Sequence, residues 1–215
     1  MGGGQLSLLE RIIVSLPAFL LAIILHELAH GYVAYLLGDD TAKRAGRLTL
    51  SPLAHLDPFG ALFFIVSSLS GFGFGWAKPV PVALERLRNP RRDEVLVTVA
   101  GPGANFAQAV AWAVLLRLAL RFAPGTLGQS LAIFCLYGIS INLLLMIFNL
   151  LPIPPLDGSH VAARVLGIGD PHLVDRLAPL GFVVLFLFVS TPAFGWLINT
   201  VLSPLMVFFL PRGFW

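Results

Sequence analysis

The chain has 215 residues, of which 57% are hydrophobic and only 12% are charged, and its mean hydropathy is +0.87. A charged fraction well below the usual ~25%, together with several apolar stretches near the ~20 residues that cross a bilayer, indicates an integral membrane protein. The net charge of +3 does not indicate a nucleic-acid-binding protein, because the basic residues flank apolar segments and form no stripe.

Residues 8–37 are predicted to form one long helix that contains the sequence HELAH at positions 26–30. This pattern places the imidazole rings of His26 and His30 one turn apart on the same helix face, where both can bind one Zn²⁺. Glu27 can then act as a general base on a metal-bound water. The alternative is two unrelated histidines on a packed helix face, but an ionisable side chain in a membrane segment is costly and indicates a functional site.

After the first helix, the chain mixes polar and apolar pieces. The alternation of residue types at 47–50 predicts a short strand. Residues 58–75 are apolar but interrupted by serines and glycines. Residues 78–83 are expected to be extended, because Pro79 and Pro81 exclude a helix.

Two more long helices are predicted at 95–122 and 130–151, followed by a helical hairpin at 177–190 and 193–210. Prolines after the third helix prevent its continuation, so Asp157 is expected on an extended or turn segment that opens a polar loop.

The fold class predicted from these elements is an all-α integral membrane protein. It is expected to be a polytopic helical bundle with about five transmembrane helices, a re-entrant or interfacial segment at 58–75 and short β-strands near the active site. One domain is expected over residues 1–215, with a catalytic core at about 8–165 and the C-terminal hairpin at about 177–210.

The distribution of positive charge predicts how the chain is threaded. If the first helix runs inward and 58–75 enters and leaves on one face, all fourteen Lys and Arg except Arg11, Arg117 and Arg121 lie on the cytoplasmic side. A full crossing by 58–75 would place the basic loops on opposite faces and would separate Asp157 from the HELAH sequence. We therefore expect an even number of complete crossings between the two.

A catalytic zinc takes three protein ligands and a water, so the two histidines need a third ligand. Cys135 is the only cysteine and lies in an apolar segment, which excludes a cysteine-based site. Most acidic residues beyond His30 lie in loops rich in Lys and Arg, where a solvated charge is the ordinary interpretation. Asp157 differs because it follows a transmembrane helix and precedes Gly158, which permits a close backbone approach. A turn or capping role is the alternative for Asp157.

Three motifs in this order resemble the site-2 protease family of intramembrane zinc metalloproteases. They are HELAH in the first helix, GPGAN at the start of a later helix, and the sequence NLLPIPPLDG that ends at Gly158. The sequence GWAKPVPV also resembles the short, mostly bacterial and archaeal branch of that family, which lacks PDZ and CBS domains. The resemblance covers residues 20–165.

The resemblance implies that His26, His30 and Asp157 bind one Zn²⁺ per chain, with Glu27 as the general base. The implied reaction is hydrolysis of peptide bonds in or near a transmembrane segment of another protein, such as a single-span membrane protein. Zinc lowers the pKa of a bound water to about 7, and Glu27 can pass its proton to the leaving nitrogen. The implied location is the inner membrane of a prokaryotic cell, with the active site towards the cytoplasm.

Several other polar residues are candidates for roles at the site. Asn149, at the end of a helix, is the better candidate to contact the oxyanion or the substrate, and Asn105 is the weaker one; interhelical hydrogen bonding is the alternative for both. His160 lies where many family members continue Asp-Gly with a second glycine, and it can be a competing ligand or a partner of the ligands. His55 and Asp57 can orient a ligand or gate water, with turn and capping roles as the alternative.

Other function classes compete with the protease prediction. A membrane zincin whose third ligand is Glu needs a helix that carries Glu beside the site, whereas Glu85 and Glu94 lie in a stretch rich in Pro and Arg. A zinc-binding transporter should show paired broken helices with several ligands at mid-membrane depth. A non-proteolytic scaffold should have lost Glu27.

Overall fold

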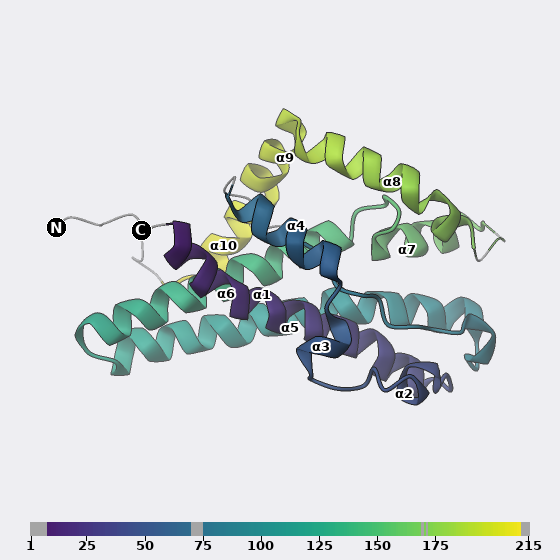
Figure 1. Cartoon of the computed structure of the whole chain (residues 1–215), viewed down its shortest axis with the longest axis horizontal. Coiled ribbons are helices and arrows are strands. Elements are labelled where there is room, and N and C mark those ends of the chain that lie inside the picture. The colour runs from purple at the N-terminus through teal and green to yellow at the C-terminus, as the bar shows by residue number, and fades with distance from the viewer. Residues whose placement is uncertain (1–7, 70–74, 169, 171, 212–215) are drawn as a thin grey trace.

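The computed structural model describes residues 8–69, 75–168, 170 and 172–211. Its three long helices are α1 (Leu8–Leu36), α5 (Pro90–Phe122) and α6 (Gly125–Asn149). The shorter elements are α2 (Thr41–Arg44), α3 (Pro52–His55), α4 (Pro58–Leu69), the 3₁₀ turn η1 (Leu84–Arg86), α7 (Asp157–Val165), α8 (Leu173–Val189), α9 (Pro192–Leu197), the π-helical stretch η2 (Ile198–Leu202) and α10 (Ser203–Phe209). Figure 1 shows α5 and α6 as an antiparallel pair crossed by α1, with α8 in a separate upper layer.

The core of the molecule lies between α5 and α6. Trp112 and Leu116 of α5 pack with Ile139 and Leu143 of α6 in one buried cluster. Gly138 permits this contact, because a Cβ at that position would lie 2.4 Å from the Trp112 indole. Helix α5 also packs against α1 and α7, so it touches every helix that carries a predicted metal ligand.

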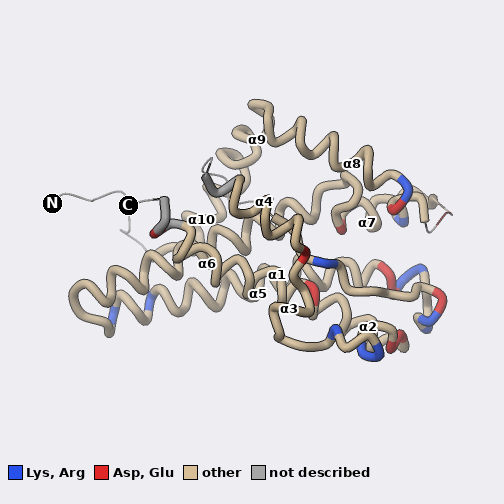
Figure 2. Tube along the Cα trace, in the orientation of Figure 1, with Lys and Arg blue, Asp and Glu red and all other residues tan. Residues whose placement is uncertain are grey.

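The described helices have the lengths and surfaces of a membrane protein. Four described segments are long and apolar enough to cross a membrane: Ile12–Leu36, Pro90–Phe122, Gly125–Asn149 and Pro192–Phe209. Many large apolar side chains on these helices face outward. Most of the charged residues lie at the end of the bundle that holds α2 and the start of α5, and near the connection between α7 and α8 (Figure 2). The predicted class, an all-α integral membrane protein, is confirmed.

The number of spanning segments, about five, stays a prediction. The first leg of the expected hairpin is α8, which has 17 residues. At 1.5 Å per residue its length is about 26 Å, at the lower limit for crossing a bilayer. The second leg is one continuous helical segment made of α9, η2 and α10. The described part of the chain therefore contains four such segments, where about five were expected.

The described parts at the two ends of the segment 58–75 lie close together. Its helix α4 has 12 residues, about 18 Å, which is too short to cross a bilayer. Residues 70–74 lie outside the described part of the chain. A Cβ on Gly60, near the start of α4, would lie 2.1 Å from the carbonyl oxygen of Trp76. The two ends of the segment therefore lie side by side, as a re-entrant segment requires.

The expected strands at 47–50 and 78–83 do not form. Among the described residues the only β-pairing is an isolated bridge between Leu56 and Ala77. The reason lies in the hydrogen bonds of residues 78–81. Two of these four residues are prolines without an N–H, and the other two N–H groups donate to a backbone carbonyl and to a side chain.

The predicted extended or turn position of Asp157 is wrong. Asp157 is the first residue of helix α7, which occupies the first half of the loop expected after the prolines. The prolines end at Pro155 and Leu156 caps the helix with an extended backbone, so nothing prevents a helix from starting at Asp157. A carboxylate in the first turn also interacts favourably with the helix dipole.

Candidate metal centre

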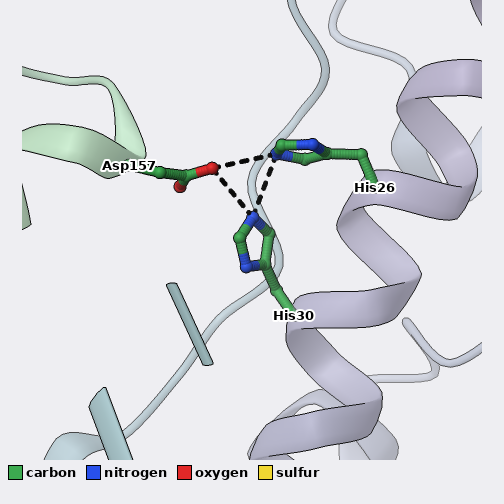
Figure 3. A group of neighbouring side chains, drawn as sticks. All are labelled: His26, His30 and Asp157. Atoms are coloured by element: carbon green, nitrogen blue, oxygen red, sulfur yellow. Dashed lines mark hydrogen bonds and ion pairs between the residues drawn. The ribbon is translucent and has the colours of Figure 1, made fainter. Parts of the chain in front are cut away.

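Three side chains from distant parts of the chain meet at one point (Figure 3). His26 and His30 come from α1, and Asp157 comes from α7. The Nε2 atoms of the two rings are 3.0 Å apart. Asp157 Oδ2 lies 3.2 Å from His26 Nε2 and 3.4 Å from His30 Nε2. Within the described ranges this is the only such group of three or more His, Cys, Asp or Glu side chains.

The dimensions of this triangle fit a zinc ion. Tetrahedral ligands at 2.0–2.1 Å from zinc are about 3.3–3.4 Å apart, and the three edges measured here are 3.0–3.4 Å. Two imidazole lone pairs that face each other repel, and Asp157 Oδ2 is buried without a well-formed hydrogen bond. A cation between the three atoms would satisfy all of them.

Asp157 is in the ionisation state that a metal ligand needs. Burial alone would raise the pKa of this carboxyl. Without a metal, protons on Nε2 of the neighbouring His26 and His30 rings outweigh burial and hold the pKa of Asp157 well below its usual range. The carboxylate is therefore charged at neutral pH.

Each histidine is oriented through its other ring nitrogen. His26 Nδ1 donates to Asn105 Oδ1 over 2.6 Å, and His30 Nδ1 donates to the Val97 carbonyl over 2.7 Å. The amide nitrogen of Asn105 donates to the Ala22 carbonyl, which turns the amide oxygen towards His26. A proton on Nδ1 leaves the Nε2 lone pair free for a metal, so both rings present the correct nitrogen to the centre of the triangle.

Helix α5 supports both rings through the GPGAN motif. A Cβ at Gly101 would lie 2.3 Å from His30 Nε2 and 2.6 Å from His26 Nε2, so only glycine lets the α5 backbone approach this closely. Asn105, four residues later, lies on the same helix face. The motif thus places the Gly101 backbone against both imidazole rings and the Asn105 side-chain amide against the His26 ring.

Glu27 lies beside the triangle with one oxygen fixed. The Val80 N–H donates to Glu27 Oε2 over 2.8 Å. Glu27 and the three candidate ligands line one cavity of about 1460 Å³. Its walls are largely apolar and come mainly from α1, α4, α5, α6, α7, α8 and residues 75–82. The polar groups therefore face a space large enough for an apolar peptide segment.

The chain is similar to bacterial and archaeal proteins over most of its length. It is 40% identical over 190 residues to YwhC of Bacillus subtilis, covering 87% of the chain and 83% of that protein. It is 30% identical over 197 residues to Rip2 of Mycolicibacterium smegmatis, with 87% and 71% covered. It is 34% identical over 149 residues to MJ0611 of Methanocaldococcus jannaschii, with 69% of each covered. All three carry the name "Putative zinc metalloprotease".

The family model of peptidase family M50 matches residues 123–190, which include Asp157. The chain belongs to peptidase family M50, the site-2 protease family. Its predicted cofactor, Zn²⁺, is confirmed by this membership, and the group formed by His26, His30 and Asp157 could hold it. No solved structure gives a significant match.

The structure gives this M50 protein's two candidate asparagines different surroundings. Asn149 lines the cavity, and its amide nitrogen donates to the Leu145 carbonyl over 3.0 Å. Asn105 is fully buried and is bonded to His26 and to Asn142 of α6. Interhelical hydrogen bonding, the alternative considered for both residues, is therefore what the structure shows for Asn105.

The remaining polar candidates lie outside the triangle. His160 Nδ1 is 3.6 Å from a carboxylate oxygen of Glu94 and does not join the three candidate ligands. His55 is fully buried and its Nε2 donates to the Thr49 carbonyl over 2.8 Å. Asp57 accepts the Gly60 N–H at the start of α4, which is the capping role considered for it, and it also lines the cavity.

Sequence reasoning missed two contributions to this M50 site. The first is the contact of Gly101 with both rings, which depends on how closely two distant helices pack. The second is Glu94, which was interpreted as a solvated charge but is buried near the start of α5 and paired with Arg164 of α7. Asn89-Pro90 is a helix-start signal that would have placed Glu94 on α5, since proline is favoured at the first helical position.

Proposed function

We propose that this protein is an intramembrane zinc endopeptidase that cleaves peptide bonds in or near transmembrane segments of membrane proteins. The observation that carries the proposal is the triangle of His26, His30 and Asp157 beside Glu27, in the wall of a large apolar cavity. In this proposal the three residues of the triangle bind one Zn²⁺. No second cluster of this kind occurs among the described residues, so nothing favours a transporter with several ion sites.

The chemistry combines the metal with Glu27. Zinc, when bound, supplies a Lewis acid that activates a water and polarises the scissile carbonyl. Glu27 accepts the proton of the attacking water and delivers it to the leaving amide nitrogen. The Val80 N–H holds one Glu27 oxygen, so the other is oriented for proton transfer. Asn149 has a second amide proton beyond the one given to Leu145, and we assign it to the developing oxyanion or the substrate backbone.

The substrate is held in the cavity mainly by apolar contacts. A peptide could also pair with an exposed backbone edge, and most of residues 75–82, which form no helix, line the cavity. Residues 78–81, however, have no N–H group left to donate, because the available ones bind Glu27 and the His55 carbonyl. A backbone edge that offers only hydrogen-bond acceptors pairs weakly with a peptide strand. We therefore expect apolar side chains of the substrate to supply most of the binding affinity for the substrate.

The active site is proposed to face the cytoplasm of a prokaryotic cell. His30 lies nearer the end of α1 that leads into the charged segments around α2 and the start of α5 (Figure 2). Those segments carry many of the basic residues of the chain, and basic loops remain on the cytoplasmic side.

Reconstitution with single-span substrates tests this function. Wild type, Glu27→Gln and Asp157→Ala are compared for cleavage and for zinc content by elemental analysis. Glu27→Gln is expected to keep zinc and lose cleavage, and Asp157→Ala is expected to lose most of both, retaining only weak metal binding. Glu10→Gln, the same substitution on the same helix but far from the site, is the control and should remain active. Undiminished cleavage by Glu27→Gln would refute the proposed chemistry.

A further inference from the structure

Asp157, the third candidate ligand, belongs to a short helix whose position must be fixed by contacts with other helices. Helix α7 has nine residues, and its main contacts are with α5 and α8. Asp157 is its first residue, whereas His26 and His30 belong to α1. The distance between Asp157 and the two rings therefore depends on how α7 docks on α5.

Glu94 of α5 provides polar contacts that attach α7 to α5. Glu94 lies near the start of α5 and is only 5% exposed. One oxygen accepts a hydrogen bond from Arg164 Nε, and the other lies 3.6 Å from His160 Nδ1. Both partners belong to α7, and their spacing places them on the same helix face as Asp157. One buried carboxylate thus holds the face of α7 that points to the metal centre.

The same face of α5 also holds the histidines. Glu94, Gly101 and Asn105 are separated by seven and then four residues, which returns each to the same side of the helix. Gly101 contacts both imidazole rings, and Asn105 bonds to His26. A single rigid helix therefore sets the positions of α1 and α7 relative to each other.

We propose that Glu94 is a positioning residue for the zinc site, which acts through Arg164 and His160 to hold Asp157 against the two histidines. The proposal rests on the ligand set proposed above. A buried ion pair contributes little net stability, because the loss of hydration offsets the attraction between the charges. The main role of Glu94 in this proposal is to fix the orientation of α7 through its contacts with Arg164 and His160.

A double-mutant cycle on the zinc dissociation constant tests the proposal. The full-length protein in detergent is titrated against a zinc chelator as wild type, Glu94→Gln, Asp157→Ala and the double variant. Glu94→Gln alone should weaken zinc binding ~10- to 100-fold, the usual effect of losing a group that orients a ligand. In the Asp157→Ala background the same substitution should change affinity by less than about twofold, because the group it positions is gone. The Co²⁺ absorption spectrum of Glu94→Gln should shift towards that of Asp157→Ala.

Two further variants make the test decisive. Arg164→Gln removes the same ion pair from the other side and should repeat the cycle. Asp40→Asn removes an exposed partner of Arg44 and Arg86 and should leave zinc affinity unchanged.

Different outcomes separate the possible failures. Equal losses from Glu94→Gln in both backgrounds, or no loss in the single variant, would overturn the positioning role. Failure of both Glu94→Gln and Arg164→Gln to fold would also overturn it, because the pair would then serve the fold itself. Full zinc affinity in Asp157→Ala would contradict the ligand set instead.

Discussion

Replacing Gly101 with alanine should remove zinc binding while leaving helix α5 intact. An alanine Cβ would lie 2.3 Å from His30 Nε2 and 2.6 Å from His26 Nε2, both inside the 3.0 Å that real Cβ contacts respect. Ordinary contact begins at 3.4 Å, so the rings or the helix must move by about 1 Å. Zinc–ligand distances tolerate only about 0.2 Å, so we expect zinc affinity to fall about 100-fold or more.

Gly103 provides a matched control within the same motif. A Cβ at Gly103 meets no atom within 4 Å. Both substitutions exchange glycine for alanine in the interior of α5, where alanine is favoured by about 1 kcal/mol. Gly103→Ala should therefore unfold at the same or a higher temperature than wild type and should bind zinc normally.

The assay is a chelator titration of both purified variants, with thermal unfolding of the metal-free proteins. The reasoning predicts that Gly103→Ala keeps the metal-free stability and the zinc affinity of wild type. Gly101→Ala should lose zinc affinity and also about 1–3 kcal/mol of metal-free stability, because its Cβ overpacks the two rings. Normal zinc affinity in Gly101→Ala would refute the close packing of α5 against the two rings. Equal losses of zinc affinity in both variants would show that a Cβ at either position weakens zinc binding, which would contradict the specific role of Gly101.

Three other predictions follow from the contacts around the site and the core. Asn105→Leu removes the acceptor of His26 and should weaken zinc binding about 10- to 100-fold in the same titration; unchanged affinity would contradict the orienting role. Val80→Pro removes the N–H that holds Glu27 and should lower kcat about 10-fold or more in the cleavage assay, with zinc content unchanged. Gly138→Ala forces a Cβ against the α5 indole, so thermal unfolding should show a loss of about 1–3 kcal/mol; no loss would contradict that packing.

The long helices were predictable because their apolar runs match the length of a membrane span. Helix α1 was placed within one residue of its observed end, while α5 and α6 each begin five residues earlier than expected. The start of α5 was missed because charged residues follow Pro90, and charge was interpreted as loop. Residues 78–83 were predicted to be extended because their prolines exclude a helix, and the same prolines remove the donors that a strand needs.

The metal centre was predictable in part. The HELAH sequence defines two ligands by local spacing alone, because both lie on one helix turn. Asp157 was distinguished from the other acidic residues by its place after a helix and before Gly158. The pattern alone left a turn role open, since the approach of Asp157 to α1 depends on tertiary packing, and the family resemblance favoured the ligand role. The roles of Gly101 and Glu94 depend on contacts between α1, α5 and α7 that no local pattern encodes.

Zinc X-ray absorption spectroscopy of the purified protein tests the ligand set most directly. The account predicts one zinc per chain, with two imidazole nitrogens and oxygen ligands at about 2.0–2.1 Å and no sulfur. Asp157→Ala should lose zinc or show an altered oxygen shell. A spectrum with a third imidazole, or one that Asp157→Ala leaves unchanged, would contradict the assignment of His26, His30 and Asp157.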